Sequence, residues 1–213
     1  MTKPKIIQLA AGMPKNIESN GKKYLSAMGK EPVREAFLSR EGLAGDGIAN
    51  REFHGGPDRA LCLYPFEHYP KWEEEFGVKL DPPVFGENIT AAGMRESEVF
   101  IGDIFKIGGA IVQITQGRVP CSTISRFNSI DPFLKRVYET SLTGYFFRVL
   151  EEGVIRVDSD IVLLERNEQG ITVFSATSAI LHKKRDAEFL QKLVALPALA
   201  EVWRDMAKKI LHE

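Results

Sequence analysis

The chain has 213 residues, of which 44% are hydrophobic and 27% are charged, and its formal net charge is -1 at pH 7. This composition indicates one large globular domain, or one domain with a small appendage, and argues against broad nucleic-acid binding. No apolar run reaches the length of a membrane span, and residues 1–5 lack a secretory h-region. The two cysteines, Cys62 and Cys121, are too few for an iron–sulfur cluster and too far apart in sequence for a CxxC redox pair. We expect a cytoplasmic protein with free thiols and no membrane or direct nucleic-acid partner.

Short strands separated by glycine-rich turns dominate the first 165 residues. Residues 12–31 indicate a loop or a loose hairpin. The strand candidates combine β-branched or aromatic residues with flanking turn residues. They are residues 5–10, 60–64, the alternating region 99–107, 111–115, 144–150, 154–157 and 161–164. This pattern predicts a mainly β protein, with a barrel or closed sheet rather than a doubly wound α/β fold.

Helical patterns interrupt this strand-rich part in two places. Four aromatic residues between 65 and 76 are spaced as on one helix face, although Pro70 would interrupt or start such a helix. His68 in this segment is expected at the surface or at an edge rather than as a metal ligand. Further on, Asp131 is expected as the N-cap of a short helix, with Pro132 at the first helical position.

The last fifty residues change to helical periodicity. Residues 173–181, 186–193 and the amphipathic segment 199–211 predict three short helices. We expect residues 1–165 to form a barrel domain that contains the whole functional site. Residues 166–213 are then a small three-helix appendage for packing or interaction, without a chemical role.

The segment from Glu41 to Arg59 contains five glycines, one proline and three Asx residues in nineteen positions. Such a segment has no room for a long helix, and its backbone can approach a ligand closely. Arg51, His54 and Arg59 stand among these glycines and could together receive an anion, particularly a phosphate. A surface loop with solvated charges remains an open alternative.

Cys121 follows directly after a predicted strand, at a corner that a proline fixes. Pro120 restricts its own φ and favours an extended conformation of Val119, so the thiol is presented in a defined direction. Arg118 lies three residues earlier, and a nearby guanidinium would favour the thiolate, which attacks electrophiles and ligates metals. A small buried hydrophobe is the alternative for Cys121, and it is the expected role of Cys62 within its apolar run.

Five short motifs in a fixed order connect these observations. They are Gly45-Asp46, His54-Gly55-Gly56, Phe85-Gly86-Glu87-Asn88, Gly102-Asp103 and Arg118-Val119-Pro120-Cys121. In this order and at these spacings they resemble the MOSC domain, the carboxy-terminal domain of molybdenum cofactor sulfurase. The layout with three terminal helices resembles the YiiM-type branch of that family. Gly117 departs from the pattern, which often has proline before the arginine, and this leaves the cysteine corner less rigid.

The resemblance implies a strongly bent, mostly antiparallel β-barrel of the pyruvate-kinase-barrel type, followed by a 3-alpha domain. It also implies binding of the molybdenum cofactor (molybdopterin), reduction of N-hydroxylated compounds such as hydroxylaminopurine and, as a general family property, pyridoxal phosphate binding. The mitochondrial amidoxime-reducing component is a related reductase. A thiolate is a soft ligand suited to molybdenum, and arginine side chains with glycine backbone suit the phosphate of the pterin.

Carried over to this chain, the resemblance makes Cys121 the molybdenum ligand and the catalytic group, with Arg118 and His54 beside it. The residues expected to hold or shape the cofactor site are Arg51, Arg59, Asn88, Asp46, Gly55, Gly56 and Arg118. Because the chain has no flavin or iron–sulfur motif, electrons would come from a separate flavoprotein donor. We therefore expect the segment 42–59 and the Cys121 corner to form two walls of one anion-receiving pocket.

Two other functions remain open at this stage. In the first, Cys121 carries a persulfide in sulfur transfer, and Arg118 keeps the sulfur anionic. In the second, the chain is a non-catalytic module that stores or carries the pterin cofactor. A zinc hydrolase is disfavoured, because no metal-ligand spacing relates the histidines to one another or to the cysteines. The histidines are His54, His68, His182 and His212.

Overall fold

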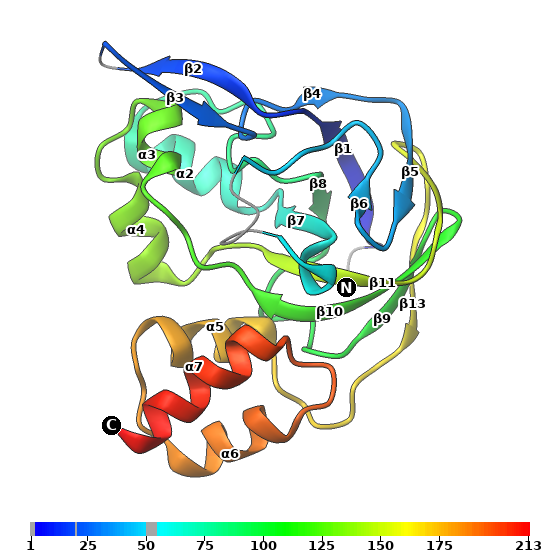
Figure 1. Cartoon of the computed structure of the whole chain (residues 1–213), viewed down its shortest axis with the longest axis vertical. Helices are drawn as coiled ribbons and strands as arrows, with labels where there is room; N and C mark the ends of the chain where they lie inside the picture. Colours follow the sequence, from blue (N-terminus) through cyan, green and yellow to red (C-terminus); the bar gives the residue numbers. More distant parts are fainter. Residues whose placement is uncertain (1–2, 20, 50–54) are drawn as a thin grey trace.

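The computed structural model of the chain describes residues 3–19, 21–49 and 55–213. Its main feature is a curled eight-stranded sheet with the strand order β13-β9-β10-β11-β7-β8-β1-β4 (Figure 1). The strands are β1 (Lys5–Ala11), β4 (Glu31–Pro32), β7 (Leu61–Pro65), β8 (Ile89–Ala92), β9 (Ile104–Ile107), β10 (Ala110–Gly117), β11 (Tyr145–Glu151) and β13 (Ile161–Glu165). The β7–β8 pair is parallel, whereas the other neighbours in this sheet are antiparallel.

The sheet bends far enough to form a half-barrel. Pairing between β10 and β11 is shifted twice, between Ile111 and Val112 and between Ile114 and Gln116, and such bulges bend the bulged strand. A backbone bridge between Lys5 and Asp160 also brings β1 close to the start of β13. The expectation of a mainly β, barrel-like fold is therefore confirmed, in the form of a curled open sheet.

Two smaller sheets complete the β structure. β12 (Gly153–Arg156), β5 (Glu35–Ser39) and β6 (Gly42–Leu43) form a three-stranded sheet. β2 (Lys15–Ser19) and β3 (Lys22–Ser26) pair as an antiparallel hairpin, which is the hairpin alternative predicted for residues 12–31.

A short helix, η1 (Pro57–Arg59), lies just before β7, and three α-helices cover another part of the half-barrel. They are α2 (His68–Phe76), α3 (Thr123–Asn128) and α4 (Phe133–Thr140). These three helices enclose a second core of aromatic residues, in which the rings of Tyr64 and Phe85 stack with their centroids 3.6 Å apart. The helix predicted between 65 and 76 is present, and Pro70 lies within its first turn.

The N-terminal end of α4 differs from the expected cap. Pro132 is the N-cap residue, and its side chain makes no capping hydrogen bond. The prediction of Asp131 at this position is therefore wrong by one residue. Instead, the hydroxyl of Ser125 on α3 accepts a hydrogen bond from the backbone N–H of Leu134, at 2.9 Å. A residue from the preceding helix thus satisfies the donor that a local cap would otherwise bind.

His68 is buried, which corrects its predicted place at the surface or at an edge. Only 7% of the residue is exposed, and its Nε2 lies 2.6 Å from the Glu96 carboxylate. Glu96 also accepts a hydrogen bond from the Gly144 N–H at 2.9 Å. A buried carboxylate needs such partners, so His68 contributes to the core at the start of α2.

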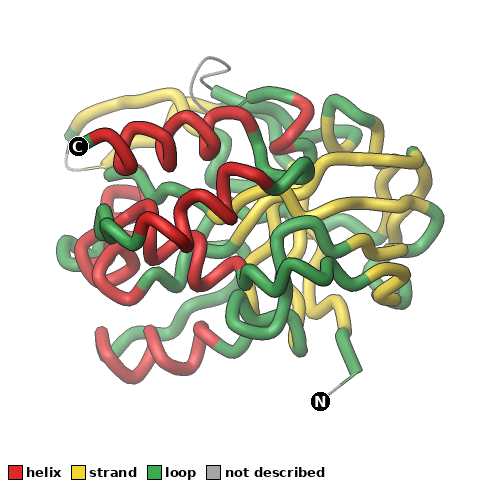
Figure 2. The backbone as a smooth tube through the Cα atoms, turned by 90° about the horizontal axis from the view of Figure 1, so that it is seen from below, coloured by secondary structure: helices red, strands yellow, loops and turns green. Residues whose placement is uncertain are grey.

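The three predicted C-terminal helices are α5 (Val173–Leu181), α6 (Ala187–Ala195) and α7 (Glu201–His212). The side chain of Thr172 caps α5, and that of Asp186 caps α6. The three helices lie together at one end of the molecule, beneath β10 in Figure 1, and the helices gather on one side of the strands in Figure 2. Buried residues such as Leu190 and Trp203 belong to the same core cluster as the strands, so the helices and the half-barrel share one hydrophobic core.

Candidate functional site

A long cleft of about 1130 Å³ lies beside the carboxyl end of β10. Most of its lining comes from the β2–β3 hairpin and the loop after it, the glycine-rich segment, the corner at 118–121, and α7, and single residues of β7, β10 and β11 contribute to it. The two segments that sequence reasoning placed together do line one cleft. The predicted site residues among its lining are Asp46, Gly55, Gly56, Arg59, Arg118 and Cys121. Arg51 and His54 lie outside the described residues.

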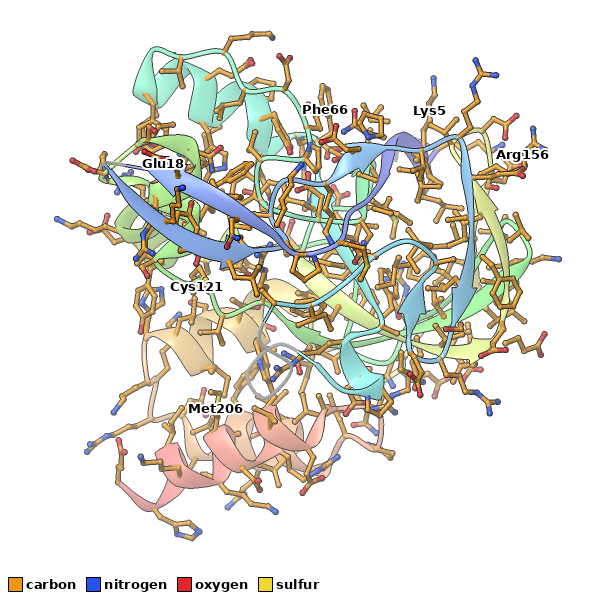
Figure 3. All side chains as sticks on the ribbon, turned by 45° about the horizontal axis from the view of Figure 1, so that its top comes forward. Lys5, Glu18, Phe66, Cys121, Arg156 and Met206 are labelled. Carbon is orange, nitrogen blue, oxygen red and sulfur yellow. The ribbon has the colours of Figure 1, made fainter. Side chains whose placement is uncertain are left out.

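Cys121 is part of the cleft lining. Figure 3 shows it between the β2–β3 hairpin, which carries Glu18, and Met206 of α7. The residue is partly exposed and its thiol is free. Its carbonyl accepts a hydrogen bond from the Ile124 N–H at 3.1 Å, which fixes the corner to the first turn of α3. The cleft therefore presents an accessible thiol on a backbone that is held in place.

Cys62 also borders the cleft, but its thiol is buried on β7. Burial raises the pKa of this thiol to about 11, and the nearby positive charge of Arg118 only partly opposes the effect. The Cys62 thiol therefore stays protonated at neutral pH and is a poor nucleophile or metal ligand. Its predicted role as a core residue is confirmed.

Arg118 and Arg59 bring positive charge to the cleft from two directions. The backbone N–H of Arg118 donates to the Gly144 carbonyl at 3.0 Å, and its guanidinium donates to the Phe85 carbonyl. The Nε of Arg59 donates to the Gln116 side chain at 3.4 Å. Burial lowers the pKa of the Arg59 guanidinium, and the neighbouring Asp58 carboxylate opposes this effect.

Two contacts of Asp58 hold the short helix η1 that carries Arg59. The Asp58 carboxylate lies 2.7 Å from the guanidinium of Arg148, and the Thr115 hydroxyl donates to the Asp58 carbonyl at 2.7 Å. Gly56 begins this turn with a φ of 110°, a backbone conformation that favours glycine. These contacts position Arg59 over the end of β10.

Asp46, which lines the cleft, joins three other parts of the chain. Its Oδ1 accepts the Gly12 N–H at 2.9 Å and also the ammonium group of Lys30, while its Oδ2 accepts the Asn88 amide at 2.8 Å. Asn88 is buried, and its Oδ1 accepts the Cys62 N–H at 3.1 Å. This geometry fits the expectation that Asp46 and Asn88 shape the site, because their hydrogen bonds fix the surrounding loops.

Lys30 is a site residue that sequence reasoning missed. Its side chain is only 6% exposed, yet it borders the cleft beside Asp46. In the sequence it is one of many lysines in a loop, and no motif marks it. Its place at the site follows from the pairing of β1 with β4, which carries the loop after β3 to the cleft.

The C-terminal helix supplies the other missed residues, namely Val202, Trp203 and Met206 on α7. The cleft therefore extends beyond residues 1–165, the part of the chain that we expected to contain the whole functional site. An amphipathic pattern predicts that α7 packs, but it does not show which surface the helix covers. The hydrophobic face of α7 buries Trp203 against the barrel and brings its neighbours to the cleft.

The position of α7 also accounts for Gly117. A Cβ atom at this residue would lie 2.7 Å from Cη2 of Trp203 and closer still to the hydroxyl oxygen of Thr177 on α5. Such distances are far shorter than an ordinary van der Waals contact. Glycine stands before Arg118 because the C-terminal helices pack directly against the end of β10.

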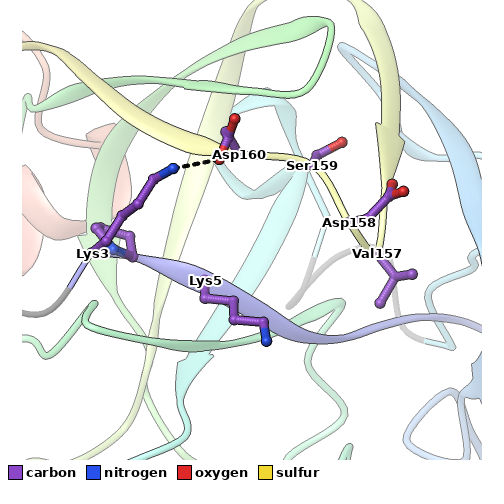
Figure 4. A pocket seen from close by; sticks show the side chains of 7 residues that line it. Lys3, Lys5, Val157, Asp158, Ser159 and Asp160 are labelled. Carbon is purple, nitrogen blue, oxygen red and sulfur yellow. Dashed lines mark hydrogen bonds and ion pairs between the residues drawn. The ribbon is translucent and has the colours of Figure 1, made fainter.

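A smaller hollow of about 340 Å³ lies between the first described residues and the turn at 157–160 (Figure 4). Its ion pair, Lys3 with Asp160 at 2.9 Å, joins side chains that are 77% and 71% exposed. Exposed pairs of this kind contribute little energy, and the hollow has no thiol or buried cation. It is therefore not a candidate site.

The cleft thus combines an accessible thiol, several cations and apolar side chains from α7. Over residues 3–19, 21–49 and 55–213, no three side chains among His, Cys, Asp and Glu cluster so as to hold a metal ion. A metal bound by Cys121 would need further ligands of its own, as in a metal-containing cofactor. Within the same ranges no helix has the length and apolar character needed to cross a membrane.

Comparison with known proteins gives matches along the chain. The MOSC domain matches residues 50–162, and the YiiM-like, 3-alpha helix domain matches residues 171–212. Over 200 residues the chain is 40% identical to an uncharacterized protein YflK of Bacillus subtilis, covering 93% of this chain and 90% of that protein. The crystal structure of YiiM from Geobacillus stearothermophilus superposes with a TM-score of 0.83 and 31% identity, covering 98% and 99% of the two chains. A protein of Gibberella moniliformis named reductase is 29% identical over 211 residues, which are 97% of this chain and 37% of that protein.

Proposed function

Because this chain belongs to the MOSC domain family, with a YiiM-like 3-alpha region, we propose that it is a molybdenum-cofactor oxidoreductase that cleaves the N–O bond of N-hydroxylated substrates. In this reaction a hydroxylamine R–NH–OH takes up two electrons and two protons and gives the amine R–NH₂ and water. A separate flavoprotein supplies the electrons.

One observation carries this proposal: the accessible thiol of Cys121 shares a single cleft with Lys30, Arg59 and Arg118. Thiolate is a soft ligand that suits molybdenum, and fixed cations suit the phosphate of a pterin cofactor. A buried or isolated cysteine would not favour such a ligand. The relative from Gibberella moniliformis that is named reductase supports the broader class, oxidoreductase.

The dimensions and donors of the cleft fit the cofactor. Typical small-molecule sites occupy about 300–1,000 Å³, and this cleft has about 1130 Å³, enough for a cofactor and a small substrate together. Cys121 would hold the metal, and Arg118, Arg59 and Lys30 would hold the anionic groups. Asp46 balances one of these charges through Lys30, so the cleft keeps an excess of cations without leaving a buried lysine unpaired.

When bound, the cofactor supplies the two-electron chemistry that breaks the N–O bond. The protein orients both molecules and stabilises negative charge. Arg118 is held by its hydrogen bond to the Phe85 carbonyl, and Arg59 by the anchored turn at 57–59, so both cations are positioned before a ligand arrives. Preorganised charge of this kind needs no rearrangement during the reaction.

Metal analysis of protein made in cells that synthesise the cofactor tests this proposal. We expect about one molybdenum per chain and reduction of hydroxylaminopurine when a flavoprotein reductase is added. Cyanide-labile sulfur without molybdenum would support sulfur transfer by a Cys121 persulfide instead. Bound pterin without turnover would support a carrier module.

Cofactor retention tests the roles of the cations. Arg59→Ala and Arg118→Ala should each weaken retention, because a hydrogen bond to a charged group contributes about 1.5–3 kcal/mol. Arg185→Ala is the matched control, since Arg185 is exposed and does not border the cleft. Unfolding curves show whether each variant is folded. Equal retention in all three variants would remove these arginines from the site.

A further inference from the structure

We propose that α7 is the substrate-selecting wall of the cleft, and that Val202 and Met206 bind the flat, largely apolar ring of an N-hydroxylated substrate. This inference rests on the proposed function for the nature of the reacting group. It adds the part of the chain that chooses the substrate, which lies outside the segment that matches the MOSC domain.

The accessible surface of α7 at the cleft is apolar. Val202 is 48% exposed and Met206 is 38% exposed, although both are hydrophobic and both border the cleft. They lie four residues apart, so they are neighbours on one face of the helix. Val119 of the cysteine corner is 39% exposed and also borders the cleft. Together these three residues offer a surface that gains free energy when a ligand covers it.

Trp203 lies beneath this surface and supports it. The residue borders the cleft but has no exposed surface, and its indole N–H is buried without a hydrogen-bond partner within the described part of the chain. Buried donors without an acceptor are costly. Because Trp203 has no exposed surface, its indole N–H lies out of reach of a ligand in the cleft, and the residue acts as the packed support of Val202 and Met206.

The wall is fixed relative to the rest of the site. The N–H of Ala200, at the N-cap of α7, donates to the Thr115 carbonyl of β10 at 3.1 Å. Arg148, which also holds Asp58, donates to the Ala198 carbonyl at 3.0 Å. The same two elements therefore position α7 and the turn that carries Arg59. A fixed wall of this kind distinguishes ligands by shape and polarity rather than adapting to each of them.

The charged side chains of the cleft lining all lie outside α7. Lys30, Arg59 and Arg118 border its other parts, whereas α7 contributes no charged side chain to the lining. An anionic cofactor is favoured near the cations, and an uncharged ring is favoured against α7. Cys121 and Met206 border the same cleft (Figure 3), so a ring bound against α7 shares one cavity with the thiol.

Binding of two probes without any reductant tests this inference on the full chain. The probes are 6-hydroxylaminopurine, which has a ring, and acetohydroxamic acid, which has none, and calorimetry gives the Kd of each. Met206→Ala and Val202→Ala should each raise the Kd of the purine about four- to fifteenfold, because each loses roughly one to two buried methylene equivalents. The Kd of acetohydroxamic acid should not change.

Val162→Ala is the matched control. The exposed fraction of Val162, 45%, is similar to that of Val202, 48%. Val162, however, lies on β13 and does not border the cleft. This variant should bind both probes like the unaltered protein. Equal changes for both probes in the α7 variants, or no detectable purine binding by the unaltered protein, would overturn the inference.

The outcome is distinguishable from failure of the proposed function. Selective loss of purine binding in a protein that lacks molybdenum would support the selecting wall and reject the reductase. Molybdenum-dependent reduction with an unchanged ratio of purine to acetohydroxamate affinity would support the reductase and reject the wall.

Discussion

Replacing Gly117 by alanine tests the contact between the half-barrel and the C-terminal helices. The added Cβ would lie 2.7 Å from Cη2 of Trp203 and would overlap the hydroxyl of Thr177 more severely. Gly117 is not among the glycines with positive φ, so alanine causes no backbone strain there. The cost therefore comes from packing alone.

The size of this packing cost depends on how much room there is for the added Cβ atom. Overpacking a well-filled core costs about 1–3 kcal/mol, and here two side chains on two helices must move. We expect Gly117→Ala to lower the free energy of unfolding by about 2–3 kcal/mol, measured by denaturant titration. Thr177→Ala removes the closer obstacle, and the Thr177 hydroxyl is buried without a hydrogen-bond partner in the described part of the chain, so its loss breaks no bond.

The double variant Gly117→Ala with Thr177→Ala should therefore recover more than half of the lost stability. Such non-additivity is the signature of two residues in direct contact. A Gly117→Ala variant with stability within about 0.5 kcal/mol of the unaltered protein, or a double variant without any recovery, would show that α5 and α7 do not press on β10 as described.

Three further predictions concern the core and the division of the chain. Because burial raises the pKa of Cys62 from 9.0 to about 11, the unfolded state loses this proton first and stability should fall by about 2–3 kcal/mol between pH 9 and 11; Cys62→Ala should remove that fall, and an unchanged pH profile would contradict it. Lys30→Met leaves Asp46 without its ammonium partner and should cost about 3 kcal/mol, with partial recovery in the double variant that adds Asp46→Asn; no loss in the single variant would refute the buried pair. Deleting residues 166–213 should give aggregated protein, because these helices share the core of the half-barrel, and a soluble, cooperatively unfolding fragment would instead support the division at 165.

Much of the fold is present in local patterns. The strands of the half-barrel carry β-branched residues between glycine-rich turns, and α5 spans the predicted residues 173–181. The Cys121 corner was predictable because Pro120 and the preceding strand fix its direction. These features depend on residues that are neighbours in sequence, so the sequence alone carries them.

The missed features depend on distant contacts. His68 is buried because Glu96, far along the chain, needs a partner in the core. The cap of α4 comes from Ser125 on another helix rather than from Asp131. Lys30 reaches the cleft only after β1 and β4 pair. No local pattern reports such contacts, whereas the fold determines them.

The apolar wall on α7 illustrates the same limit for the site. Val202 and Met206 look like ordinary members of an amphipathic helix, and they become part of the site only because the helix starts against β10. The packing of Thr177 and Trp203 against β10 also explains the glycine at position 117. The sequence shows this departure from the family pattern but not its cause.

The molybdenum content and hydroxylaminopurine reduction of Cys121→Ala and Cys62→Ala, each compared with the unaltered protein, test the proposed role of the cleft. Cys121→Ala should lose molybdenum-dependent reduction, because the accessible soft ligand is gone, while its unfolding curve stays close to that of the unaltered protein. Cys62→Ala should keep both metal and reduction and lose only stability, by about 1 kcal/mol. Reduction at the unaltered rate by Cys121→Ala would contradict the assignment of Cys121 as the metal ligand.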